Sequence, residues 1–209
     1  MSAEEGIYFY PNRWALIVLS SAEEIVGDKG VAALLNMAGL QVYINNYPPD
    51  NMKKEFPFEH VARLQKAFGD MYGPRGARVF STRAGQQSFK DGLARFGSVK
   101  QAFDLAMRVG TFEQRMNIAL GFFAKWFNTV SDQVVSTEIT DDHWVWYIER
   151  CPMCWGLKSD QPICHLAVGV LQAAATFASQ GNRYRVDAVE CIANGAARGI
   201  IKVQKEPIG

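Results

Sequence analysis

The stretch Gln133–Glu149, "QVVSTEITDDHWVWYIE", divides the chain into two halves of different pattern. Its two ends, "QVVSTEI" and "HWVWYIE", are rich in β-branched and aromatic residues, which favour paired strands, and "TDD" is typical of the turn between them. Two similar segments follow later in the chain, "YRVDAVE" from Tyr184 and "GIIKVQ" from Gly199. Adjacent strand pairs of this kind predict an antiparallel sheet in the C-terminal half.

Helical patterns dominate the chain before this stretch, and one more helix is predicted between the strand pairs. The strongest begins after the N-cap residue Thr111, and the last is expected to turn Leu166 and Phe177 toward the core. Breaks are expected at Gly27, at Gly39 and at "YGPRGAR", because glycine and proline interrupt helices. The sequence therefore predicts an α+β fold, a helical N-terminal half packed on an antiparallel β-sheet. The predicted helices cover 13–26, 29–39, 57–71, 86–96, 99–109, 111–130 and 162–180.

The size and composition of the chain indicate one globular domain. It has 209 residues, of which 48% are hydrophobic and 21% charged. We expect a single domain over 1–209, with a helical N-terminal segment at 1–56 and a core at 57–209. The segment "IYFYPNRWALIVL" carries more aromatic surface than one helix needs. This surplus predicts a homodimer through residues 1–56, since two-fold dimers are the commonest closed assembly.

Charge and hydropathy exclude some partners. A formal net charge of +1 argues against nucleic-acid binding. No apolar run approaches the roughly 18 residues that a bilayer-spanning helix needs, and the acidic start "MSAEEG" lacks the basic region of a signal peptide. We therefore expect a cytoplasmic protein without membrane insertion. In that compartment a cysteine cluster is more typical of metal binding or redox chemistry than of disulfides.

All four cysteines lie in the last third of the chain. Cys151 and Cys154 form C-x-x-C, a spacing that lets two thiolates face one cation, and tetrahedral zinc needs two more ligands. Cys164 and Cys191 are the other cysteines of the chain, so the pattern predicts a structural zinc site of four thiolates. An iron–sulfur cluster also accepts four thiolates, and buried free thiols are a third interpretation. A thioredoxin-like redox pair is disfavoured, because "CPMC" lacks the strand-to-helix context.

The sequence from Cys164 onward, "CHLAVGVLQAAATFASQGNRYRVDAVECIANG", resembles the 4-vinyl reductase domain. That family of small-molecule-binding domains includes the sensory modules of phenol-responsive activators. It is related in fold to the haem-nitric-oxide-binding and TRAPP Golgi-transport domains. The shared pattern is Cys164, Gly169, Gly181 and the C-x-A-x-G motif that starts at Cys191. The segments "LLNMAGL" and "YGPRGARVFSTRAG" in the helical half are also similar to bacterial members.

The chain departs from this family at two metal-binding positions. Sensory members hold zinc with a cysteine like Cys164, an acidic residue, a cysteine like Cys191 and a final cysteine. Here the acidic position is Ala188 and the final cysteine position is Gly199. The resemblance therefore implies that the C-x-x-C pair replaces the two missing ligands. Glu190 is a weaker candidate, since neighbouring residues of a strand point to opposite faces.

The resemblance also implies an apolar pocket for an aromatic hydrocarbon or a tetrapyrrole-like ligand. Aromatic residues gather in the long helix and the strand after the "TDD" turn, where core packing is the alternative interpretation for each. Arg83, Tyr72 and His60 are candidates for polar contacts at the mouth of the pocket. The predicted ligand-binding residues are Phe123, Trp126, Phe127, Trp144 and Trp146, with Tyr72 and Arg83 as the polar contacts.

Catalysis has little support in the sequence. The sequence shows no recognisable serine–histidine–acid set and no G-x-G-x-x-G motif of a dinucleotide site. We therefore assign no catalytic residue. We therefore expect a binding module for a hydrophobic small molecule, with a structural metal, rather than an enzyme. The alternatives are an enzyme or accessory subunit in tetrapyrrole (bacteriochlorophyll) vinyl-group reduction, and a scaffolding protein.

Overall fold

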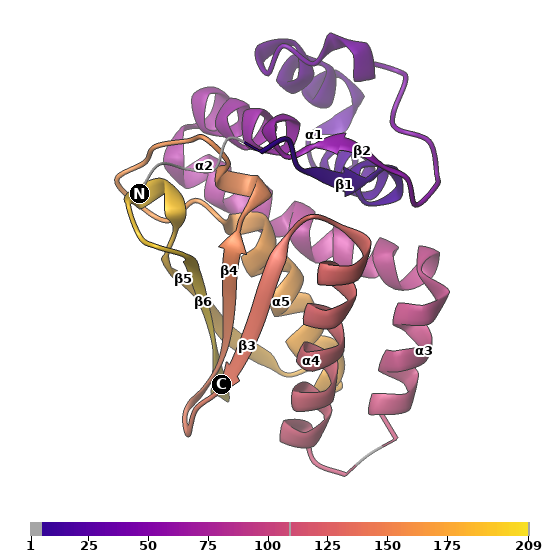
Figure 1. Cartoon of the computed structure of the whole chain (residues 1–209), viewed down its shortest axis with the longest axis vertical. Coiled ribbons are helices and arrows are strands. Elements are labelled where there is room, and N and C mark those ends of the chain that lie inside the picture. Colours follow the sequence, from indigo (N-terminus) through magenta and orange to yellow (C-terminus); the bar gives the residue numbers. More distant parts are fainter. Residues whose placement is uncertain (1–5, 109, 209) are drawn as a thin grey trace.

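A computed structural model describes residues 6–108 and 110–208, and it confirms the α+β fold. A helical N-terminal half precedes the strands of the main sheet (Figure 1). The predicted helix end at Val109 and the first five residues, which include the acidic Glu4 and Glu5, lie outside the described residues. The elements run in the order β1 (Phe9–Pro11), α1 (Asn12–Met37), β2 (Lys54–Pro57), α2 (Phe58–Arg95), α3 (Gly97–Ala106), α4 (Phe112–Val130), β3 (Val134–Ile139), β4 (His143–Arg150), α5 (His165–Ala178), β5 (Arg183–Glu190) and β6 (Gly199–Ile208).

The main sheet is antiparallel with strand order β3-β4-β6-β5. The "TDD" segment joins β3 and β4 as predicted, with the Thr140 N–H donating to the His143 carbonyl at 2.9 Å. Helices α4 and α5 cover one face of the sheet (Figure 1). Trp144 and Trp146 share that face, as the two-residue period of a strand requires, and both are buried against aromatic rings of α4.

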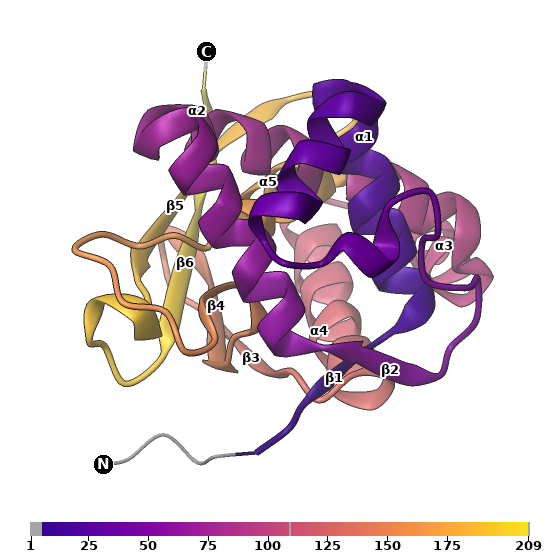
Figure 2. The ribbon, with the colours of Figure 1, turned by 90° about the horizontal axis from the view of Figure 1, so that it is seen from above.

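Helices α1 and α2 each contain a glycine kink. Gly27 (φ 76°, ψ 166°) interrupts α1, and Gly73 (φ 67°, ψ 171°) interrupts α2 at the predicted "YGPRGAR" break. Glycine adopts positive φ without the steric cost of a Cβ, and Pro74 then suits the first turn of the resumed helix. The predicted interruptions are therefore correct, but the chain returns to a helix at once. Figure 2 shows the kinked α1 and α2 beside each other, with α5 behind them.

Strands β1 and β2 were not predicted from the sequence. They pair antiparallel, with Tyr10 opposite Phe56, and tie the start of α1 to the start of α2. The apolar segment that predicted a dimer is largely buried inside the chain, since Trp14 and Ile17 expose only 4% and 0% of their surface. Its aromatic surplus therefore has an intramolecular explanation. The homodimer stays a prediction that light scattering can test.

The long helix α4 begins as predicted. Thr111 is its N-cap in a capping box, with the Gln114 N–H donating to Thr111 Oγ1 at 3.3 Å and the Thr111 N–H donating to Gln114 Oε1 at 2.9 Å. In α5, Phe177 faces the core only in part: its ring contacts the buried ring of Phe89, with centroids 6.0 Å apart, but it is 37% exposed near the C-terminal end of the helix. None of the described helices combines the length and apolar character that crossing a bilayer requires.

Candidate functional site

The four cysteines lie at the ends of two strands, one helix and one short 3-10 turn. Cys151 directly follows β4, and Cys154 ends a short 3-10 turn that begins at Pro152. Cys164 is the N-cap residue of α5, and Cys191 directly follows β5. Each exposes 1% of its surface or less. The structure therefore brings all four thiols, which sequence analysis proposed as metal ligands, to one end of the sheet and buries them.

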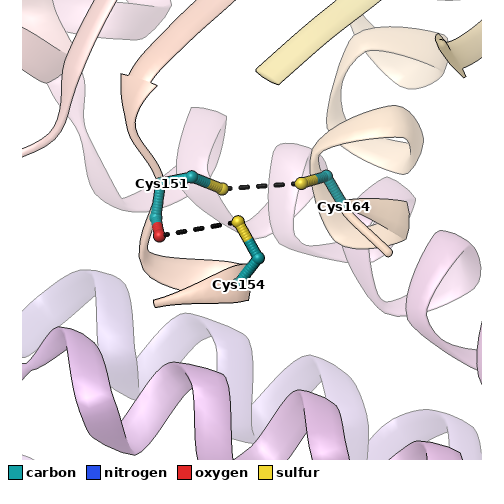
Figure 3. Close-up of side chains that lie close together, drawn as sticks. All are labelled: Cys151, Cys154 and Cys164. Carbon is teal, nitrogen blue, oxygen red and sulfur yellow. Dashed lines mark hydrogen bonds between the residues drawn. The ribbon is translucent and has the colours of Figure 1, made fainter. Parts of the chain in front are cut away.

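The sulfur atoms lie at distances that suit one small cation. Cys164 Sγ is 3.5 Å from Cys151 Sγ and 3.4 Å from Cys191 Sγ. The sulfurs of Cys151, Cys154 and Cys164 all lie within 4.8 Å of one another (Figure 3). Zinc–sulfur bonds of about 2.3 Å in a tetrahedron separate the sulfurs by about 3.8 Å. Three thiols therefore lie close enough together to share one ion, and Cys191 touches this group through Cys164 but lies further from at least one of the other two sulfurs.

The pKa values of the clustered thiols are shifted in opposite directions. Hydrogen bonds from the Cys154 and Cys164 thiols lower the pKa of Cys151 to about 5, against the opposing effect of burial. Hydrogen bonds with Cys151, Cys154 and Cys191, together with burial, raise the pKa of Cys164 well above its ordinary value. The group therefore favours one buried thiolate held by neighbouring thiols. A divalent cation would replace the remaining protons and neutralise the charge.

Two tight turns present the cysteines. The Leu157 N–H donates to the Cys154 carbonyl at 3.0 Å, and the Cys191 N–H donates to Asn194 Oδ1 at 3.0 Å. Positive φ at Gly156 (68°) and Gly195 (91°) lets each turn close. The two turns contact each other, because Ser159 N–H donates to the Ala193 carbonyl at 2.9 Å. The backbone thus holds both cysteine turns together.

The positions of the missing acidic and cysteine ligands, 188 and 199, carry residues that pack in the sheet. Ala188 lies in β5 opposite Ile201, and Gly199 is buried at the start of β6. A Cβ at Gly199 would lie 3.4 Å from the Ile148 Cβ, in van der Waals contact with the core. Glu190 is exposed. Neither Ala188 nor Gly199 can supply a ligand, whereas the C-x-x-C pair stands within reach of Cys164.

Two small cavities lie beside this cysteine cluster. The first, of about 40 Å³, lies among α1, α2 and α5, and the second, of about 30 Å³, lies between α4, α5 and the sheet. Four side chains line both cavities: Tyr10, Trp14, Met153 and Leu166. Met153 stands between Cys151 and Cys154, and Leu166 comes two residues after Cys164. The cysteine turns therefore contribute directly to the wall that the cavities share.

Three of the predicted pocket residues line the second cavity, namely Phe123, Phe127 and Trp146. Trp126 lies beside them and contacts the ring of Trp14, but its side chain lines neither cavity. Trp144 is packed elsewhere, since its indole N–H donates to Asn117 Oδ1 at 2.6 Å and its ring meets Phe112. The aromatic cluster is thus partly cavity wall and partly core.

The two predicted polar contacts also lie away from the cavities. Tyr72 is half-buried against the Phe80 ring, with centroids 4.5 Å apart, and Arg83 is exposed on α2. The polar side chains that do line the first cavity are Tyr10, Gln65 and Ser81, together with the indole of Trp14. These polar residues could not be recognised in the sequence, because they lie on elements far apart in the chain and belong to no motif.

Comparisons with known proteins show the fold. Neither a family model nor a curated protein matches the chain. Solved H-NOX domains do match along nearly their whole length. An H-NOX protein of T. tengcongensis has a TM-score of 0.58 at 12% identity, covering 95% of this chain and 100% of the other. One from S. oneidensis, solved in an Fe(II)NO state, has a TM-score of 0.55 at 13% identity, covering 93% and 99%.

A third match is an oxygen-binding H-NOX domain related to soluble guanylate cyclases, solved as the oxygen complex. Its TM-score is 0.56 at 12% identity, covering 91% of this chain and 93% of the other. Identities this low establish a shared fold and nothing finer. The chain therefore has an H-NOX-like fold, the fold to which the resemblance in sequence pointed.

The residues at the cavities do not fit haem. Haem iron is bound by histidine, cysteine thiolate, methionine or tyrosine. Of the described residues, no histidine or cysteine lines either cavity, which leaves Tyr10 and Met153. Burial raises the pKa of Tyr10 well above its ordinary value, and the Tyr10 hydroxyl donates to Gln133 Oε1. Haem-sized pockets also measure several hundred Å³, far more than about 40 Å³.

Proposed function

We propose that this chain is a binding protein for a hydrophobic small molecule, built as a single domain over residues 1–209 and stabilised by a metal ion on four cysteines. One observation carries the proposal: the largely apolar cavities are lined by Met153, which lies between two cysteines of the buried thiol cluster, and by Leu166, two residues after Cys164. The H-NOX-like fold and the retained Cys164 and Cys191 also support kinship with the 4-vinyl reductase domain.

The chemistry of the four thiols favours zinc as the ion. Soft thiolates in a tetrahedral set select zinc, and four protein ligands leave no open position for water, so the role we propose is structural. An iron–sulfur cluster places each thiolate on its own iron or shares two per iron, which spreads four sulfurs further apart than contacts of 3.4 Å and 3.5 Å about one thiol. A single ion therefore suits the geometry better.

The size of the cavities favours a small ligand over a tetrapyrrole. In the form described, each cavity has room for a few water molecules at most. The side chains that line both cavities include Met153, and this unbranched, adaptable side chain can move to merge the two cavities around one ring. We therefore propose a ligand of about one aromatic ring. Tetrapyrrole vinyl-group reduction and scaffolding are not favoured by any contact at this site.

Ligand binding can be tested by filling the cavity from α5. Ala167 lines the second cavity and Ala173 lines neither, although both lie half-buried on the same helix. Ala167→Phe should abolish the saturable uptake of small aromatic compounds, measured by isothermal titration, while Ala173→Phe should leave it unchanged. If the wild-type protein binds no compound in a broad apolar panel, the proposal is wrong.

A further inference from the structure

The first cavity contains two buried hydrogen-bond donors without partners. The indole N–H of Trp14 and the hydroxyl of Ser81 have no hydrogen-bond partner. Trp14 is 4% exposed on α1 and Ser81 is 2% exposed on α2, and both side chains line this cavity. The two donors come from different helices, and each belongs to a side chain that lines the same cavity. They are therefore a shared feature of the cavity and not of either helix.

Unpartnered buried donors need an explanation. Most buried polar groups in native proteins are hydrogen-bonded, because an unmet donor keeps its full desolvation cost. The rest of this wall is mainly aliphatic and aromatic, and no charged side chain among the described residues lines it. A volume of about 40 Å³ holds one or more waters, but the two side chains must turn to offer their donors to it, because neither donor atom has appreciable accessible surface in this conformation. A ligand oxygen can take that place.

We infer that the first cavity recognises an uncharged, mainly apolar molecule through one carbonyl oxygen, which accepts hydrogen bonds from Trp14 Nε1 and Ser81 Oγ. A carbonyl oxygen has two lone pairs, so it can satisfy both donors at once. A pure hydrocarbon would leave both donors unmet. A carboxylate would bring a charge into a wall without a cation to pair with it. The inference rests on the proposed function and names the ligand class of the same site: ketones and aldehydes.

The test compares ligands that differ only in the acceptor. Each ketone in a graded series from 2-butanone to acetophenone is paired with the alkene in which a =CH₂ group replaces the carbonyl oxygen, such as α-methylstyrene for acetophenone. Free ligand is measured by headspace partition over the protein solution. We expect at least one ketone to bind roughly tenfold or more tightly than its alkene, since one unmet buried donor costs about that factor.

Substitutions test whether the Trp14 and Ser81 donors cause the preference for ketones over alkenes. Ser81→Ala and Trp14→Phe each remove one donor, and each should reduce the ketone preference several-fold. Ser88 is a matched control for Ser81: it is on the same helix, is 0% exposed and has no partner for its hydroxyl, but lines neither cavity. Ser88→Ala should therefore keep the full preference. Thermal melts identify any variant that fails to fold, and in that case the wild-type pairs decide alone.

The outcomes separate this inference from the proposed function. Equal binding of ketones and alkenes by the wild-type protein would overturn the carbonyl inference and leave the hydrophobic binding function standing. A preference that survives both Ser81→Ala and Trp14→Phe, or that Ser88→Ala removes, would also overturn it. Failure of both ligand types at every size would overturn the proposed function, and the inference with it.

Discussion

Gly85 in α2 and Gly169 in α5 lie where the two helices cross with their backbones in contact. A Cβ added to Gly85 would lie 2.1 Å from the Leu166 carbonyl oxygen, and one added to Gly169 would lie 2.0 Å from the Thr82 carbonyl oxygen. Only glycine permits this approach on both sides. Because Leu166 lines both cavities, the crossing also fixes part of the cavity wall.

Gly85→Ala and Gly169→Ala should each destabilise the protein by about 2–3 kcal/mol, since a backbone oxygen cannot rotate away as a flexible side chain can. Urea unfolding measures the change. The control is Gly121→Ala in α4, where an added Cβ meets nothing within 4 Å. That substitution should stabilise the protein by about 0.5–1 kcal/mol, because alanine favours a helix over glycine. Equal effects at all three positions would disprove the close crossing.

Metal analysis tests the cysteine site. Freshly purified protein should contain one zinc per chain, and Cys164→Ser or Cys191→Ser should lower zinc content and melting temperature together, since the other ligands lose their shared ion. A strong chelator should lower the melting temperature of the wild type and leave that of Cys164→Ser nearly unchanged. Metal-free wild-type protein whose melting temperature is insensitive to both zinc and chelator would rule the site out.

Metal and ligand should affect each other's binding. Met153 lies between two cysteines of the cluster and lines both cavities, so fixing its turn also positions the cavity wall. We expect removal of zinc to weaken ligand binding by roughly fivefold or more, and bound ligand to strengthen zinc binding by the same factor, as linkage requires. Calorimetry of each partner with and without the other measures both factors. Identical ligand affinity in zinc-loaded and zinc-free folded protein would contradict the coupling.

His60 should make stability depend on pH. Burial, helped by the positive charge of Arg63, lowers the pKa of His60, whose Nδ1 lies 3.1 Å from the Tyr43 hydroxyl. The unfolded chain, with a histidine pKa of about 6.5, therefore binds more protons than the folded chain just below that pH. The contribution of His60 to stability should fall as pH falls through about 6.5 and level off below the folded pKa of His60.

His60→Gln should flatten this part of the pH profile, measured by urea unfolding between pH 7.5 and pH 5. A proton NMR titration of the folded wild type gives the pKa of His60 directly. A value at or above that of an unstructured histidine would show that the imidazole is not desolvated as the packing indicates.

Local features of the fold could be predicted from the sequence. The capping box at Thr111 and Gln114, the kink at Gly73 and the "TDD" hairpin depend on residues within a few positions of one another. Their energetics are local, so the pattern suffices. The pairing of β1 with β2 could not be predicted, because each strand is too short for a period to show and its partner lies far along the chain.

At the cysteine site, some features follow from the sequence and others from the tertiary structure. The sequence by itself determined the four thiols, their C-x-x-C spacing and their places at the ends of a strand, a helix and a second strand. Tertiary structure decided that Cys164 stands between Cys151 and Cys191 at contact distance, and that the cavities open beside Tyr10, Trp14 and Ser81. Periodicity reports which face of an element is buried. It does not report how far two buried faces stand apart, since that distance depends on packing between elements such as the Gly85–Gly169 crossing.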